Sequence, residues 1–137
     1  MSKRAYEVSV SKTELTAEPP LPNLFEYIFT ITECDPLLVT ARLTANFFPE
    51  TREIDIEDFN VSKGFTDSGR GKALLKELLE ESRRIGAVVI EGSPIISREC
   101  LDAVSAVFGR EHVDVRVVGE YGESDTHAHL VFPVEAS

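Results

Sequence analysis

The sequence predicts an α+β fold (mixed α/β) in which a central mixed sheet of about six to seven strands carries two main helices. Three observations predict this fold. Runs rich in β-branched and aromatic residues fill the first part of the chain and return near its C-terminus. Two stretches, 68–85 and 98–108, space their apolar residues as helices do. Between them, residues 87–92 form a short, continuously apolar run, which is typical of a buried parallel strand.

Length and composition indicate one domain. With 137 residues, 42% of them hydrophobic, the chain can bury a core, and we expect a single domain over residues 1–137. The sequence has no run of 18 apolar residues and no signal peptide, so we expect no membrane partner and a cytoplasmic location. A formal charge of −10 disfavours nucleic acid and suits a cationic partner or substrate, although it also serves solubility.

Cysteine and histidine spacing predicts neither a disulfide framework nor a metal site. Cys34 and Cys100 lie far apart without a CxxC pattern, so we expect two buried free thiols. His127 and His129 would share one face of a strand. No third ligand can be identified beside them, and two histidines in this pattern are a weak zinc signal.

The N-terminal part of the chain predicts antiparallel strands. Residues 4–10 alternate in polarity, and residues 13–23 carry three prolines, which exclude a long helix and indicate a loop. Residues 24–33 and 37–48 are rich in β-branched and aromatic side chains. The turn-forming residues 34–36 between them predict an antiparallel hairpin.

The next predicted strand, 52–61, contains a change of phase. Two apolar pairs would lie on opposite faces of a regular strand: Ile54 with Ile56, and Phe59 with Val61. One extra residue near Glu57 and Asp58 would return both pairs to one face, which predicts a β-bulge at this point. The alternative is a sheet covered on both faces, where a regular strand needs no bulge.

The remaining elements follow in the order helix, strand, helix, hairpin, so the whole chain reads β-β-β-β-α-β-α-β-β. The helix over 68–85 buries a stripe that comprises Leu74, Leu75, Leu78, Leu79 and Ile85, and it ends at Gly86. A right-handed crossover then places 87–92 parallel to 52–61. Ser97 caps the helix over 98–108, and residues 112–120 and 127–134 form a terminal hairpin around 121–126.

A glycine pair stands at the start of the first helix. Gly69 and Gly71 flank Arg70, and Lys72 follows. A helix N-terminus exposes unpaired N–H groups and attracts anions, glycines let a phosphate approach, and the two basic side chains add positive charge. This pattern predicts a pyrophosphate cradle. Glycine-rich turns also occur for packing alone, and neither a Walker pattern nor a complete G-x-G-x-x-G is present.

Residues 54–94, "IDIEDFNVSKGFTDSGRGKALLKELLEESRRIGAVVIEGSP", resemble the central motif of the GNAT superfamily of N-acetyltransferases. In that motif a strand ending in Val passes through a turn of the form R/Q-x-x-G-x-G/A into a helix. Val61 matches the strand-terminal Val, Gly69 and Gly71 match the paired glycines, and Gly86 matches the glycine that ends the helix. The order of the following elements agrees as well, so the resemblance covers about residues 52–134.

The resemblance implies an acetyl-CoA site. In such proteins acetyl-CoA lies in a V between two parallel strands that a bulge separates, here 54–61 and 87–92. The pantetheine would pair with the main chain of Phe59, Asn60 and Val61. The pyrophosphate would sit on the loop that comprises Thr66, Asp67, Ser68, Gly69, Arg70, Gly71 and Lys72.

Several positions depart from the family pattern. Thr66 replaces the usual Arg or Gln, and Asp67 replaces a Gly and brings a negative charge toward the proposed phosphates. Ser105 lies near the place where many members have a proton-donating Tyr. Residues 13–23 are too few to hold the two N-terminal helices that usually wall the acceptor pocket. The acceptor is then large, or a second subunit in a homodimer completes the pocket, or the transferase activity is lost.

The implied reaction is the transfer of an acetyl group from acetyl-CoA to a cationic amine by direct attack. Glu57 at the bulge is the candidate base, with Asp55 and Asp58 as competitors, and Tyr121 could replace the missing acid. Solvated strand carboxylates and a surface tyrosine are the plainer interpretations. The alternative function is a catalytically degenerate binding or regulatory protein that retains at most a CoA cleft. A third is an interaction subunit whose strands over 24–48 pair with another chain.

Overall fold

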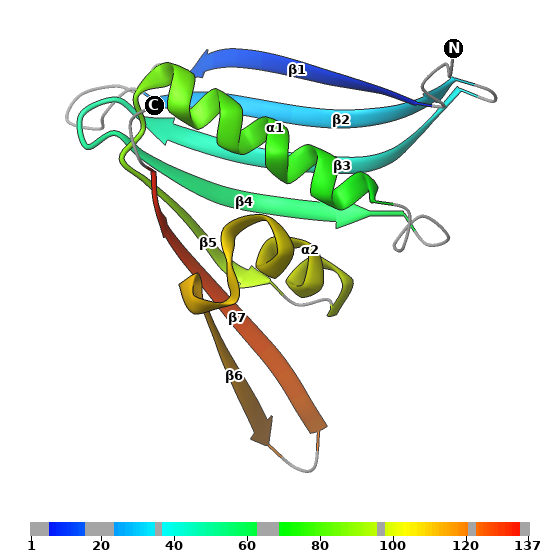
Figure 1. Ribbon diagram of the computed structural model, residues 1–137, viewed down its shortest axis with the longest axis vertical. Helices are drawn as coiled ribbons and strands as arrows, with labels where there is room; N and C mark the ends of the chain where they lie inside the picture. Colours follow the sequence, from blue (N-terminus) through cyan, green and yellow to red (C-terminus); the bar gives the residue numbers. More distant parts are fainter. Residues whose placement is uncertain are drawn as a thin grey trace.

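The computed structural model describes residues 6–15, 24–34, 37–62, 69–95, 98–120 and 123–134 (Figure 1). Its strands are β1 (Tyr6–Leu15), β2 (Leu24–Cys34), β3 (Leu37–Phe48), β4 (Glu53–Val61), β5 (Val89–Ile95), β6 (Val113–Glu120) and β7 (Glu123–Pro133). Its helices are α1 (Arg70–Ile85), α2 (Arg98–Phe108) and the short 3-10 helix η1 (Arg110–His112). Apart from η1, the order of the elements is the predicted one.

The strands form one sheet with the spatial order β1-β2-β3-β4-β5-β7-β6. Only β4 and β5 are parallel neighbours in it, so the sheet is mixed, as predicted. Two strands are three residues longer than predicted. β1 runs to Leu15 because it pairs with β2 over its whole length, and β7 begins at Glu123, which pairs with Glu120. Cross-strand pairing extends both strands into segments whose composition indicates a loop.

Both helices lie on one face of the sheet (Figure 1). Helix α1 packs on β2, β3 and β4 and contacts α2, which packs on β4 and β7. Leu74, Leu75 and Leu78 of α1 are fully buried, which confirms the predicted stripe. We call the opposite side of the sheet the open face, because none of the described helices covers it. Neither described helix is long and apolar enough to cross a membrane.

The predicted bulge in β4 is present. Thr44 of β3 pairs with Asp58, and the next residue of β3, Ala45, pairs with Ile56. Glu57 is therefore the extra residue of β4. It returns Phe59 to the face on which Ile56 is buried, and Phe59 packs against the core.

Strands β4 and β5 separate soon after they meet. Their parallel ladder runs from Glu53 opposite Val89 to Ile56 opposite Gly92 and ends there. Strand β4 continues to Val61 along β3. The two strands thus diverge at the bulge, as the sequence predicts.

The expectation of buried thiols is wrong for Cys34, which is free and exposed. Cys34 is the last residue of β2 and pairs with Leu37, itself 81% exposed. This end of the hairpin lies beyond the hydrophobic core, so an apolar residue type there is not buried. The side chain of Cys100 lies outside the described residues.

Candidate functional site

The first turn of α1 packs against the part of β4 that follows the bulge. A Cβ atom on Gly71 would lie 3.2 Å from Phe59 Cζ and 3.2 Å from Val61 Cγ2, with Ala103 Cβ of α2 at 3.6 Å. Glycine therefore lets α1 approach β4 closely at this point. Gly69 has a different role. It is the residue before the helix and adopts a left-handed φ of 81°, a conformation that disfavours residues with a side chain.

Main-chain N–H groups at the N-terminus of α1 are not hydrogen-bonded within the helix. The first intrahelical hydrogen bond runs from Ala73 N–H to the carbonyl oxygen of Gly69. The N–H groups of the preceding helical residues have no acceptor within the helix. The first turn carries no acidic side chain, and Lys72 within it is exposed. The positive end of the helix dipole is thus not neutralised by a carboxylate of that turn.

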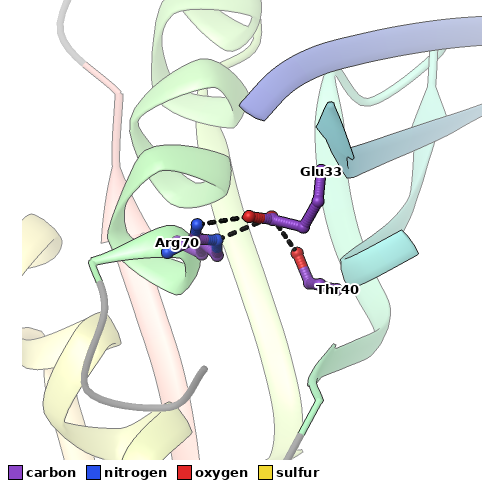
Figure 2. Close-up of polar contacts among 3 residues, drawn as sticks. All are labelled: Glu33, Thr40 and Arg70. Atoms are coloured by element: carbon purple, nitrogen blue, oxygen red, sulfur yellow. Dashed lines mark hydrogen bonds and ion pairs between the residues drawn. The ribbon is translucent and has the colours of Figure 1, made fainter. Parts of the chain in front are cut away.

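The side chain of Arg70 reaches from this turn to the end of β2 (Figure 2). Arg70 Nε donates to Glu33 Oε2 at 2.8 Å, and Arg70 Nη2 donates to Glu33 Oε1. Thr40 Oγ1 donates to Glu33 Oε2 at 2.7 Å. The guanidinium also lies 4.7 Å from the ring centroid of Tyr6. Only 12% of the Arg70 side chain and 11% of the Glu33 side chain are exposed.

The ion pair with Glu33 reduces the positive charge that the Arg70 side chain presents to an anion. Glu33 compensates the guanidinium charge that was expected to contribute to a phosphate cradle. Hydrogen bonds from Arg70 hold the pKa of Glu33 below its usual value, against the effect of burial, and Thr40 lowers it further. The hydrogen bond to Glu33 raises the pKa of Arg70 in turn. Among the described residues near the glycine pair, Lys72 carries a side-chain charge that Glu33 does not engage.

Replacing Glu33 with Gln is expected to lower the melting temperature in a pH-dependent way. At neutral pH the change leaves a largely buried guanidinium without its counter-ion. The folded-state pKa of Glu33 is depressed, so its stabilisation is complete above the ordinary value of 4.5 and is lost as the pH falls through the folded value. Thermal unfolding from pH 7 to pH 3 should show the gap between wild type and Glu33→Gln narrowing in acid.

Glu80→Gln is the matched control, because it removes the same charge from an exposed position of α1. It should leave the melting temperature nearly unchanged at neutral pH. A gap for Glu33→Gln that stayed constant down to pH 3 would contradict the ion pair.

The other predicted site residues are only partly brought together. Phe59 and Val61 pack inward beside Gly71, whereas Asn60 is exposed and donates from Nδ2 to Asp58 Oδ1 at 2.8 Å. Glu57 is exposed at the bulge. Thr66, Asp67, Ser68 and Tyr121 lie outside the described residues.

Ser105 of α2 stands where the resemblance leads one to expect a tyrosine. Its Oγ atom is buried, and no hydrogen bond to it is found within the described part of the chain. The predicted missing acid is thus replaced by a short hydroxyl that is not solvent-exposed. A buried donor without a partner carries a free-energy cost.

Asp55 lies near the point of divergence and differs from its neighbour Glu57 in being half-buried. Burial raises the pKa of Asp55 above its ordinary value, and the negative charges of Glu57 and Glu91 raise it further. His129 acts in the opposite direction. From sequence, Asp55 is only a competitor of Glu57 for the role of base, without a connection to Glu91 or His129. The pairing of β4, β5 and β7 brings Asp55, Glu91 and His129 together, and a local sequence pattern does not predict this pairing.

Comparison with known proteins identifies the fold. No family model matches the sequence, and no curated protein sequence matches it. Solved structures do: nourseothricin acetyltransferase aligns with a TM-score of 0.62 at 14% identity, over 96% of this chain and 99% of that chain. An acetyltransferase from Bacillus subtilis, solved with CoA, aligns with a TM-score of 0.62 at 13% identity, over 94% and 100% of the two chains.

A third structure, an acetyltransferase of the GNAT family from Staphylococcus aureus, aligns with a TM-score of 0.56 at 8% identity. It covers 80% of this chain and 69% of that one. These likenesses cover 80% or more of this chain, at identities too low to transfer a substrate. The chain therefore has the GNAT fold.

Proposed function

We propose that this protein is an N-acyltransferase that binds acetyl-CoA between β4 and β5 and transfers the acetyl group to a cationic amine. One observation carries the proposal. The β4–β5 ladder ends at Ile56 and Gly92, and a helix N-terminus packs against the part of β4 beyond that point. The Bacillus subtilis neighbour, solved with CoA, supports the same kind of ligand. The formal charge of −10 favours a cationic acceptor.

The residues present fit the cofactor. The β4–β5 ladder ends at Ile56, and the pantetheine arm would run along the following part of β4, beside Phe59, Asn60 and Val61. The pyrophosphate would lie at the first turn of α1, near the main-chain N–H groups of Gly69, Gly71 and Lys72, with Lys72 supplying the side-chain charge. Arg70 belongs to the same turn, and its guanidinium binds Glu33. Thr66, Asp67 and Ser68 complete the proposed loop.

Acetyl-CoA supplies a thioester that is reactive toward neutral amines. Glu57, exposed at the bulge, takes the proton from the incoming ammonium directly or through water, because a protonated amine has no lone pair for attack. The amine nitrogen would bond to the acetyl carbon, the carbon–sulfur bond would break, and the second proton that the nitrogen loses would replace the one that the departing thiolate takes up. Tyr121 is the proposed donor of the proton that the thiolate takes up.

The second candidate is a binding or regulatory protein with the same cleft. The uncovered sheet face favours it, because acyl transfer gains from an enclosed acceptor and the described helices leave this face open. A homodimer would remove the difficulty if a second copy walled the acceptor site.

Two assays separate these candidates. Calorimetric titration with acetyl-CoA should give saturable binding, and a thiol-trapping assay should show free CoA appearing only when an amine is added. Binding without amine-dependent thiol release would favour the second candidate. No binding at millimolar acetyl-CoA would overturn both.

A further inference from the structure

A row of polar side chains crosses the open face at the level where β4 and β5 still pair. Glu26 of β2 lies opposite Asn46 of β3, Asn46 lies opposite Asp55 of β4, and Asp55 lies opposite Glu91 of β5. Their neighbours along the strands are buried in the helix-side core: Tyr27, Ala45, Phe47, Ile54, Ile56 and Ile90. Since successive side chains alternate between faces, these four residues share the open face. We call them the open-face row.

Asn46 at the centre of the row has a side-chain oxygen that accepts no hydrogen bond from the described residues. Only 6% of Asn46 is exposed, and its Oδ1 atom is buried with no hydrogen-bond partner in the described part of the chain. Directly opposite residues in an antiparallel pair have Cβ atoms roughly 5 Å apart, so this amide lies against Asp55. A buried oxygen without a donor is costly, and it points to a donor that another molecule supplies.

The carboxylates of the row have no ion-pair partner among the described residues. The row contains three of them, and the charge of Glu57 also acts on Asp55. No ion pair between described residues involves any of them, and His129 is the group that opposes the raised pKa of Asp55. No group of three or more His, Cys, Asp or Glu among the described residues could hold a metal ion. An organic cation with N–H donors satisfies both the carboxylates and Asn46 Oδ1.

The position of the row indicates whether the amine that it binds is also the amine that reacts. Asp55 and Glu91 form the pair next to Ile56 and Gly92, where the β4–β5 ladder ends. Several carboxylates around one amine stabilise its protonated form and oppose its conversion into a nucleophile. An ammonium in the row is therefore poorly placed to be the reacting group, while a second amine on the same molecule could extend into the gap.

We propose that the open-face row binds an ammonium group of the acceptor, and that the acceptor carries at least two amino groups. One amine stays charged against Asp55, Glu91 and Asn46, and the other enters the gap between β4 and β5 as the neutral nucleophile. The role of the second amine rests on the proposed function. The binding of the first does not, so the two can be tested separately.

Calorimetric titration with 1,4-diaminobutane and with butylamine, without acetyl-CoA and at low ionic strength, tests the row. The diamine should bind about tenfold more tightly than the monoamine, because two charges interact with the acidic cluster. Asp55→Asn and Glu91→Gln should each weaken diamine binding by about tenfold. Glu80→Gln, which removes the same charge from exposed α1, should change it by less than about twofold.

A folding defect would not explain a loss of diamine affinity in Asp55→Asn. The folded-state pKa of Asp55 is raised, so its ionised form costs stability above that pKa, and the cost vanishes below the ordinary value of 3.8. Asp55→Asn should thus melt at or above the wild-type temperature at pH 7 while losing diamine affinity. Equal affinities for the two amines, or full diamine binding by Asp55→Asn and Glu91→Gln, would overturn the proposal.

The same variants separate this inference from the proposed function. If acetyl-CoA fails to bind while the diamine binds and Asp55→Asn abolishes its preference over butylamine, the row stands and the acyltransferase does not. If acetyl-CoA turns over, Asp55→Asn should raise the KM for 1,4-diaminobutane about tenfold more than it raises the KM for butylamine. Equal KM changes for both amines would overturn the anchoring role.

Discussion

Lys72→Glu is expected to weaken acetyl-CoA binding by about tenfold or more, whereas Lys76→Glu should leave it within about twofold. Lys72 is exposed in the first turn of α1, where the helix dipole and the main-chain N–H groups favour an anion. A carboxylate there opposes the pyrophosphate directly. Lys76 is exposed one turn further along the same helix, so its substitution changes the net charge equally at a greater distance. Calorimetric titration of both variants gives the comparison.

Ionic strength provides a second test of the same contact. Salt screens exposed charges, so the difference between the Lys72 and Lys76 variants should shrink between about 0.05 M and 0.5 M salt. Equal losses of affinity in the two variants would show that the overall field, and not the start of α1, attracts the cofactor.

Gly71→Val is expected to lower the free energy of unfolding by about 1–3 kcal/mol or more. The first added atom alone would lie 3.2 Å from both Phe59 and Val61, and two further methyl groups would follow it. The helix must then move away from β4, or the partners must leave their packed positions. Because this contact also places the first-turn N–H groups beside β4, acetyl-CoA affinity should fall with stability. Urea unfolding monitored by circular dichroism measures the change in midpoint.

The control for this substitution is Lys72→Val, which introduces the same side chain at the next position of the helix, where the native residue is exposed. It should change the unfolding midpoint much less. An unchanged midpoint in Gly71→Val would mean that α1 does not press on β4, and the glycine pair would then need another explanation.

The bulge and the divergence of the strands could be predicted from sequence because their signal is local. Within ten residues, Ile56 and Phe59 change parity, and only an extra residue reconciles them with one buried face. The helix stripe and the glycine at its end are local for the same reason. Strand ends were harder to predict, since β1 continues to Leu15 through its pairing with β2 and not through its own composition.

The contacts between side chains at the site could not be predicted from local sequence patterns. Arg70 and Glu33 are 37 positions apart, and their residue types alone do not predict that they form an ion pair. One signal was present: Glu33 follows Phe29 and Ile31 at the parity of buried residues, where a charge needs a partner. The open-face row left a similar trace in Asn46, which lies within an apolar run. Cross-strand register, which the sequence does not state, turns these isolated polar residues into clusters.

Backbone amide NMR during titration with CoA tests the central claim most directly, because the account places the ligand between β4 and β5 and at the start of α1. The largest shift changes should fall on the amides of Asn60, Val61, Gly71 and Lys72, with β1 as an unaffected internal reference. Shifts confined to other parts of the sheet, or none at millimolar CoA, would contradict the account.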